Sequence, residues 1–275
     1  MTAGRGAIHE GDCVELLRTL PAGCAQLVIA DPPYNLGPRF GVATEWLRDP
    51  KWLDWCGEWL AECQRILSDD GNLFVYGIHH YLCLLQVRLY EMGMCYRRQI
   101  IWHYENGFTT YRRNLATHYE PILWFSRRPD SYFRPIREPY KSTDRLRHRI
   151  IKNGKEWTPH PDGRLAGDVW SFPTLAGRRF SGERVDHPAQ KPLALTDRVV
   201  SHFSAPGALV EAAGRVRKAP PHAGRHGQGL GETFGRGSAV RGTSHSQNTG
   251  ALKLKLSSCS RPIPKTPFLP SLITV

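Results

Sequence analysis

The stretch AQLVIADPPYNLG, residues 25–37, decides the fold class of this chain. It opens with apolar residues and a single glutamine, which is typical of a buried strand, and the two prolines after the aspartate end that strand. Asp31 therefore stands at the carboxyl end of a buried strand, where open α/β sheets place their ligand crevice. The stretch predicts a strand that leads directly into a binding-site loop.

The chain around this strand alternates between helical and strand-like patterns. Predicted helices cover residues 13–20, 50–67, 79–92 and 192–203, predicted strands cover 72–77, 97–103 and 120–126, and another strand opens at 208–210. Asp49 before Pro50 has the form of an N-cap followed by proline at the first helical position. Alternating strands and helices are the signature of an open, largely parallel sheet, so the predicted fold class is α/β.

Composition excludes several classes of protein. With 275 residues and 40% hydrophobic content, the chain can bury one substantial core. No run approaches the roughly 18 apolar residues of a membrane helix, and the N-terminus has no apolar signal. The seven cysteines form no CxxC pair, which argues against a zinc site or a disulfide framework. We expect a cytoplasmic protein with reduced thiols, no membrane contact and no metal.

The net charge of +12 is unevenly distributed along the chain. Residues 1–125 hold 11 Lys and Arg against 14 Asp and Glu, whereas residues 126–184 hold 14 against 7. The segment 127–184 also breaks the alternation of strands and helices, and it is rich in arginine, proline, glycine and aromatic residues. A protein that contacts a polyanion with one lobe needs such a distribution, although a merely solvated surface remains the alternative.

The side chains of Asp31, Pro32, Pro33 and Tyr34 suit chemistry on an amino group. Two successive prolines stiffen the loop and remove two N–H donors, which leaves carbonyl oxygens free to accept hydrogen bonds. Asp31 adds a carboxylate acceptor and Tyr34 a flat ring. Acceptors that hold the hydrogens of an exocyclic amine favour a pyramidal nitrogen and aim it at a methyl donor. Taken alone, the four residues also fit a proline-rich turn that caps a strand.

The stretch GDCVELLRTLPAGCAQLVIADPPYNLG, residues 11–37, resembles the start of the β-class DNA amino-methyltransferases, in which the DPPY motif precedes the cofactor motif. Further strings follow in the order that this class uses: IIWHYENGF (100–108), HYEPILWFSRR (118–128), REPYK (137–141), GDVWSFP (167–173) and ERVDHPAQKPLAL (183–195). The resemblance covers about residues 10–210. It implies a Rossmann-like fold that uses S-adenosylmethionine and carries an inserted target-recognition lobe.

The resemblance also implies roles for individual residues. The catalytic motif consists of Asp31, Pro32, Pro33 and Tyr34, which hold a base that has left the duplex, with Tyr34 as its stacking platform. Predicted cofactor contacts come from Asp12, Cys13, Asp31, Gln190 and Lys191. Two of these have a structural alternative, because Asp12 can cap the helix at 13–20 and Lys191 can be a solvated lysine of a first helical turn.

By the same resemblance the chain divides into four segments. These are a catalytic half at 1–126, a target-recognition region at 127–184, the start of a cofactor-binding half at 185–210 and an aberrant tail at 211–275. Double-stranded DNA is the expected partner, with phosphate contacts from Arg112, Arg113, Arg145, Arg147 and Arg149. Each of these arginines can also be an ordinary surface charge.

The tail is where the sequence departs from the class. After SAPGALV (204–210) the class continues into a strand that ends in a motif like DPFxGSGTT, whereas this chain reads EAAGRVRK. Residues 211–275 hold 9 Gly and 6 Pro and have almost no periodicity. The hypothesis is a frameshift near Val210, with a genuine disordered basic tail as the alternative. A lost strand and glycine loop would leave a sheet edge unpaired and make activity doubtful.

The favoured function is therefore transfer of a methyl group from S-adenosylmethionine to adenine N6 in DNA. Methylation of cytosine N4 is one alternative, since enzymes of that kind in this class more often carry SPPY. A non-catalytic remnant that only binds DNA is a second, and an RNA methyltransferase is a weaker third. A homodimer and a cognate restriction endonuclease are the further partners to expect.

Overall fold

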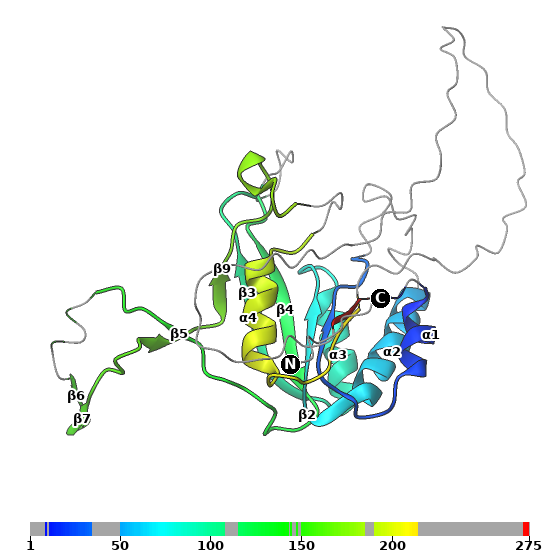
Figure 1. The fold of residues 1–275 in the computed structure, drawn as a ribbon, viewed down its shortest axis with the longest axis horizontal. Coiled ribbons are helices and arrows are strands. Elements are labelled where there is room, and N and C mark those ends of the chain that lie inside the picture. The colour runs from blue at the N-terminus through cyan, green and yellow to red at the C-terminus, as the bar shows by residue number, and fades with distance from the viewer. Residues whose placement is uncertain are drawn as a thin grey trace, which may run out of the picture.

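The computed structural model describes residues 9, 11–34, 50–107, 115–142, 144, 147, 150–184 and 190–213, together with the backbone of 272–274. Seven strands form one sheet in the order β11-β10-β1-β2-β4-β3-β9 (Figure 1). They are β1 Ala25–Ala30, β2 Leu67–Tyr76, β3 Cys95–His103, β4 Tyr119–Ser126, β9 Val169–Ser171, β10 Val210–Ala213 and β11 Leu272–Thr274. The predicted α/β fold class is confirmed.

The sheet is parallel except at β4. Strand β1 runs parallel to β10 on one side and to β2 on the other, and β9 runs parallel to β3. Strand β4 lies between β2 and β3 and is antiparallel to both. It follows β3 directly in the order of elements, and consecutive antiparallel strands need no crossover helix. The prediction of a largely parallel sheet therefore holds for every pair except the two that β4 makes.

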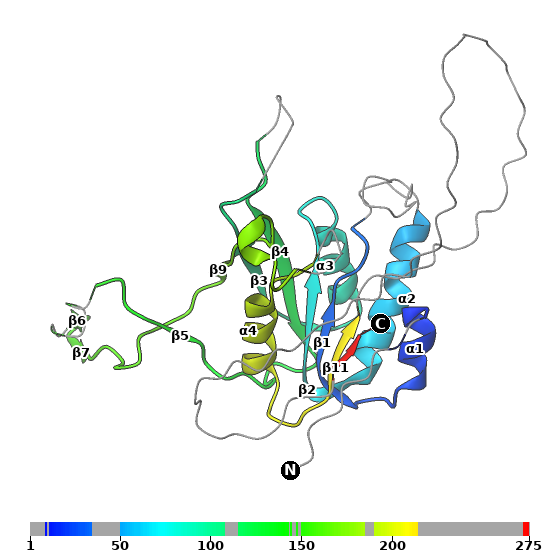
Figure 2. The same cartoon turned by 45° about the horizontal axis from the view of Figure 1, so that its top comes forward.

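Helices cover both faces of the sheet (Figures 1 and 2). One core contains residues of α1 Cys13–Thr19, α2 Pro50–Ile66 and α3 Leu82–Glu91, and the other contains residues of α4 Leu193–Phe203. Helix α2 buries one apolar face, which contains Trp52, Trp59, Cys63 and Ile66. These helices begin and end within three residues of their predicted bounds.

Strand β2 begins earlier than the sequence predicts. The predicted bounds leave residues 68–71 between helix and strand, but these residues lie inside β2. The pairing with β1 jumps from Ala25 opposite Leu67 to Leu27 opposite Asn72, so the residues between them bulge out of the register. A Cβ at Gly71 would lie 2.9 Å from the carbonyl oxygen of Ser68, which explains why glycine occupies this bulge.

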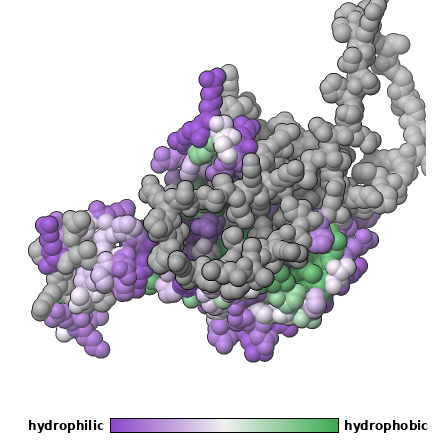
Figure 3. Space-filling model, viewed as in Figure 1, coloured by the Kyte–Doolittle hydropathy of each residue, from purple (hydrophilic) through white to green (hydrophobic). Residues whose placement is uncertain are grey.

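The middle segment projects from the sheet as a long arm (Figures 1 and 2). Its elements are β5 Arg137–Glu138 paired with β8 Arg164–Leu165, and the hairpin of β6 Ile150–Lys152 with β7 Lys155–Trp157. The segment returns to the sheet at β9 and continues through the 3-10 helix η3 Arg178–Phe180 to α4. The hairpin turns through Asn153 and Gly154, both with positive φ, as two-residue hairpin loops require. The described surface of this arm is largely hydrophilic (Figure 3).

Strand β10 corrects the expectation that a sheet edge is left unpaired after residue 210. Strand β10 pairs in parallel with β1, from Leu27 opposite Val210 to Ala30 opposite Ala213, so the edge of β1 is not unpaired as predicted. The backbone of β11 then pairs in parallel with β10. The expected boundary between residues 210 and 211 falls inside β10. Residues 214–271, most of the predicted tail, lie outside the described residues.

Glu211 on β10 has unusual surroundings. Its side chain is completely buried, and neither carboxylate oxygen has a hydrogen-bond partner among the described residues. Burial raises the pKa of this carboxyl from 4.5 to about 8. Such a residue destabilises the sheet, because a buried polar group without partners loses its hydration and gains nothing in return.

Candidate active site

The loop after β1 lies at the carboxyl end of a buried parallel strand, as the sequence predicts. The backbone N–H of Asp31 donates to the carbonyl oxygen of Ala213 at 2.8 Å, which fixes the start of the loop to the end of β10. Pro32 is buried, and Asp31, Pro33 and Tyr34 are half-buried. The motif from Asp31 to Tyr34 is therefore held at the carboxyl ends of the parallel strands, with its side chains partly accessible.

Both carboxylate oxygens of Asp31 accept hydrogen bonds. The ammonium of Lys191 donates to Oδ2 at 2.9 Å, and the hydroxyl of Tyr34 donates to Oδ1 at 2.8 Å. Lys191 lies just before α4, whose N-cap is Pro192. The structure thus unites predicted residues from two distant parts of the chain, and it holds the Asp31 carboxylate in a fixed orientation.

A second carboxylate, that of Glu120 at the start of β4, joins this group. Its Oε2 accepts from the Tyr34 hydroxyl at 3.2 Å and lies 3.9 Å from the ammonium of Lys191. Burial and the nearby Asp31 raise the pKa of Glu120, although Lys191 and Tyr34 act in the opposite direction. Glu120 was not predicted from the sequence. The signal was an acidic residue inside the otherwise apolar strand HYEPILWFS.

Lys191 is a buried cation, so the alternative of a solvated lysine is wrong. Its side chain is 12% exposed. Burial alone would lower its pKa, but the carboxylates of Asp31 and Glu120 raise the pKa above its ordinary value, so the side chain stays charged. Its ammonium lies 5.2 Å from the ring centre of Tyr34 and 5.4 Å from that of Tyr76. Two carboxylates and two aromatic faces thus form a site for a positive charge.

Tyr76, at the end of β2, is the second site residue that was not predicted from the sequence. Its side chain is 1% exposed, and its hydroxyl has no hydrogen-bond partner among the described residues. Burial, with the nearby charges of Asp31 and Glu120, raises its pKa far above the ordinary value. The hydroxyl therefore stays protonated and is a buried donor without an acceptor.

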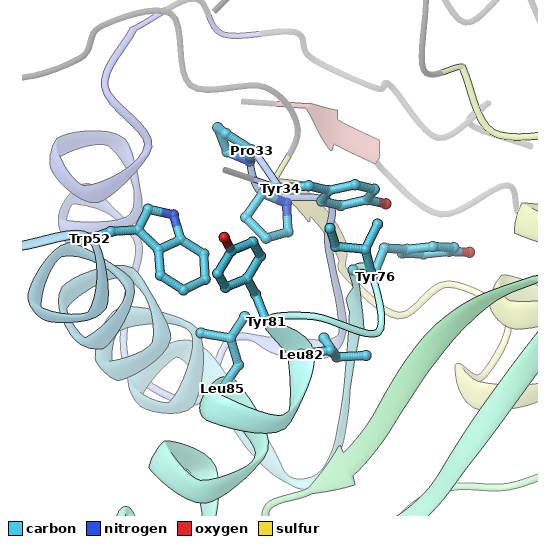
Figure 4. Close-up of a pocket in the computed structure, with 10 residues that line it drawn as sticks. Pro33, Tyr34, Trp52, Tyr76, Tyr81, Leu82 and Leu85 are labelled. Atoms are coloured by element: carbon cyan, nitrogen blue, oxygen red, sulfur yellow. The ribbon is translucent and has the colours of Figure 1, made fainter. Parts of the chain in front are cut away.

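An apolar pocket adjoins the motif on the side of α2 and α3 (Figure 4). Pro33, Tyr34 and Tyr76 form one wall, and Trp52 and Tyr81 form the opposite one. The rings of Trp52 and Tyr81 are 5.5 Å apart and tilted by 60°. In Figure 4 the hydroxyls of Tyr34 and Tyr76 point away from this pocket and in the same direction. The polar group around Asp31 therefore lies beside the pocket and not inside it.

The other predicted cofactor residues have structural roles in this structure. Asp12 caps α1, since its Oδ1 accepts from the backbone N–H of Val14 at 2.9 Å and of Glu15 at 3.2 Å, which confirms that alternative. Cys13 lies in the core, and burial raises the pKa of its thiol to about 12. Gln190 donates to the carbonyl oxygen of Glu183 at 2.9 Å and so links the chain after η3 to the start of α4.

Of the five predicted DNA-contacting arginines, the structure describes only Arg147. Its side chain is exposed and lies 3.4 Å from Asp144. Arg112, Arg113, Arg145 and Arg149 lie outside the described residues. In the part of the chain that the structure covers, no group of three or more His, Cys, Asp or Glu is placed to hold a metal ion. Within that same part, every helix is too short or too polar to cross a membrane.

The chain matches a known protein family over most of its length. Residues 25–211 match the family described as DNA methylase, of the N6/N4 type. The chain is 31% identical to Type II methyltransferase M1.MboII of Moraxella bovis, covering 74% of this chain and 81% of that protein. It is 28% identical to DNA adenine methyltransferase YhdJ of Escherichia coli, covering 74% of this chain and 69% of that protein.

A solved structure supports the fold at lower sequence identity. The PvuII DNA methyltransferase, named as cytosine-N4-specific, superposes with a TM-score of 0.55 over 77% of this chain and 75% of its own, at 15% identity. At that identity the likeness concerns the fold alone, and it agrees with the expected Rossmann-like methyltransferase fold. The matched family region contains both the loop after β1 and Lys191.

Proposed function

This chain belongs to the N6/N4 DNA methylase family, and from that premise we propose that it methylates adenine N6 in double-stranded DNA at the loop Asp31–Tyr34. One observation carries the proposal: a carboxylate with an adjacent aromatic ring is fixed at the carboxyl end of β1. The relatives include a protein named as a DNA adenine methyltransferase, which supports adenine as the target base.

The residues of the loop suit an amino group that must become a nucleophile. The lone pair of an exocyclic amine is delocalised into its ring, so the isolated amine is a poor nucleophile. A carboxylate that accepts an N–H hydrogen bond from this amine favours the pyramidal nitrogen and directs it. The ring of Tyr34 offers a stacking surface that offsets part of the cost of extruding a base, about a few kcal/mol.

The same group of residues fits the family's cofactor, S-adenosylmethionine, which supplies an electrophilic methyl group on a positively charged sulfur. The fit rests on the two tyrosine rings and two carboxylates around Lys191, since a sulfonium beside them needs groups of this kind and the Lys191 charge is already balanced by the carboxylates. We assign cofactor contacts to Asp12, Cys13, Asp31, Gln190 and Lys191. Asp12 and Cys13 would contribute chiefly through the backbone at the start of α1, because their side chains are engaged there.

The segment 127–184, which includes the projecting arm, is the proposed target-recognition region. Its basic charge and its distance from the core favour contact with the phosphates of DNA. The five arginines predicted from the sequence, with Arg147 among them, are the proposed phosphate contacts. We further propose a cytoplasmic location, a homodimer and a cognate restriction endonuclease; the relative named as a Type II methyltransferase favours the last.

A catalytically inactive DNA-binding protein is the second candidate, and the buried Glu211 favours it. A frameshift near Val210 would explain both this unpaired carboxylate and the missing glycine motif. Reading the gene in its other two frames tests the hypothesis. A GSG-like motif in one of them would support it, and the absence of any continuing family pattern in both would refute it.

Methyl transfer from labelled S-adenosylmethionine to unmethylated DNA of mixed sequence tests the proposed function directly. The chain is compared with a form that carries a repaired C-terminal reading frame, and the product nucleosides are identified. N6-methyladenine from either protein supports the proposal, whereas N4-methylcytosine would identify the alternative target. Salt-dependent DNA binding without transfer in both forms would point to the inactive DNA-binding protein.

A further inference from the structure

The hydroxyl of Tyr76 is the most unusual polar atom near the proposed site. It is buried at the carboxyl end of β2, beside the loop that follows β1, and it has no partner among the described residues. A buried hydroxyl without a hydrogen bond destabilises a folded protein. A bound ligand that accepts a hydrogen bond from this hydroxyl would explain why tyrosine occupies this position.

This hydroxyl lies near the residues that hold the base in the proposed function. Its ring lies under the Lys191 ammonium at 5.4 Å, as the ring of Tyr34 does at 5.2 Å. The charges of Asp31 and Glu120 both act on it. The two tyrosine hydroxyls point in the same direction, away from the apolar pocket (Figure 4). The Tyr34 hydroxyl has acceptors in Asp31 and Glu120, whereas the Tyr76 hydroxyl has none among the described residues.

We propose that Tyr76 is a base-reading residue that donates a hydrogen bond to the ring nitrogen next to the target amine, while Asp31 accepts from the amine itself. This inference rests on the proposed function, because it places the extruded base beside Asp31. An acceptor and a donor side by side complement an NH2–C=N edge. Adenine presents that edge with N6 and N1, and cytosine presents it with N4 and N3.

The same pair of groups rejects thymine, and it rejects guanine at the O6–N1 edge. Both present a carbonyl oxygen beside a ring N–H there, which would set acceptor against acceptor at Asp31. A hydrogen bond at the ring nitrogen also occupies its lone pair, which is the competing nucleophile in adenine and cytosine. Tyr76 would thus contribute to the choice of base and to the choice of nitrogen within it.

Lys191 competes with the target amine for Asp31, because its ammonium donates to Oδ2 at 2.9 Å. Glu120 can receive it, since this carboxylate lies only 3.9 Å from the ammonium and already accepts from Tyr34. Asp31 can therefore accept from the target amine while the Lys191 ammonium pairs with Glu120, so that no buried positive charge is left without a counter-charge.

Binding of short single-stranded homopolymers tests the inference without requiring catalysis, because no base needs to leave a duplex. Fluorescence anisotropy would compare oligodeoxyadenylate, oligodeoxycytidylate and oligothymidylate on the full chain and on Tyr76→Phe. We expect the full chain to prefer the first two over the third, and Tyr76→Phe to reduce that preference about 3- to 10-fold. Tyr96→Phe, at the opposite end of the sheet, serves as the control and keeps the preference.

Thermal unfolding separates a binding role from a structural one. Loss of an unpartnered hydroxyl should leave the Tm of Tyr76→Phe unchanged or raise it by up to about 4 °C. An unchanged base preference in Tyr76→Phe, no preference in the full chain, or a clear fall in Tm would each overturn the inference. The expected base preference, and its reduction in Tyr76→Phe, can also occur when neither the chain nor its repaired form transfers methyl groups. That result would refute the proposed function but would still support Tyr76 as a residue that recognises the base.

Discussion

Two neighbouring parallel strands carry carboxylates that have opposite surroundings. At the end of β1, Asp31 accepts one hydrogen bond at each oxygen and lies beside a lysine. On β10, Glu211 is fully buried and neither oxygen has a partner among the described residues. A buried carboxylate is tolerated when donors surround it and is costly when they do not. Among the described residues, hydrogen-bond donors surround Asp31 but not Glu211. The proposed change of reading frame near Val210 would produce this difference.

The largest expected effect on stability comes from removing the cation beside Asp31. Lys191→Met leaves Asp31 and Glu120 as two close, half-buried carboxylates without a counter-charge. We expect the free energy of unfolding to fall by about 3 kcal/mol at neutral pH. Urea denaturation measures this change, with Lys152→Met in the exposed β6–β7 hairpin as the control. A loss equal to that of the control would show that the ion pair does not stabilise the site.

The opposite change is expected at the unpaired carboxylate. Glu211→Leu should raise the free energy of unfolding by about 2 kcal/mol at pH 9. Because folding raises this pKa from 4.5 to about 8, the wild-type protein binds an extra proton when folded. Its stability therefore falls as the pH rises from 4.5 to 8, and the benefit of leucine grows over that window.

Glu211→Gln is the matched control for this prediction, since it removes the charge but keeps a buried polar group. It should abolish the pH dependence with a smaller gain in stability than leucine gives. Denaturation curves at pH 5 and pH 9 would decide between these outcomes. A Glu211→Leu protein with no gain at pH 9 would mean that the carboxylate is satisfied in solution.

The smallest expected effect concerns Asp12, which the sequence could assign either to a helix cap or to the cofactor. The structure shows the cap, so Asp12→Ala should lower the free energy of unfolding by about 1 kcal/mol. Asp54→Ala, on the exposed side of α2, is the control. Full stability in Asp12→Ala, accompanied by weaker binding of S-adenosylmethionine, would assign the side chain to the cofactor instead.

The sequence predicts most of the fold and half of the site, and the division has a physical basis. Periodic apolar residues locate β1, α2 and α4 because burial on one face leaves a local pattern. The direction of β4 leaves no such pattern, and the predicted parallel order fails there. Asp31 and Lys191 were each predicted as site residues. Their ion pair could not be predicted, because the two residues lie 160 positions apart in the sequence.

Glu120 and Tyr76 escaped prediction for a related reason. Each lies at one end of a strand beside a run of apolar residues, and its role depends on which strand lies next to it. Tyrosine is common in strands, so its unpartnered hydroxyl becomes visible only when the packing around it is known. Residues whose function depends on sheet order cannot be read from a single strand.

Single-turnover methyl transfer by Asp31→Asn, in whichever form of the chain is active, tests the central claim most directly. Asparagine keeps the size of the side chain but removes the charge that holds Lys191 and accepts from the target amine. We predict a fall of about a hundredfold to a thousandfold in the transfer rate, while Asp69→Asn at the surface leaves the rate unchanged. Equal rates in the two variants would contradict the assignment of Asp31 as the residue that grips the amino group.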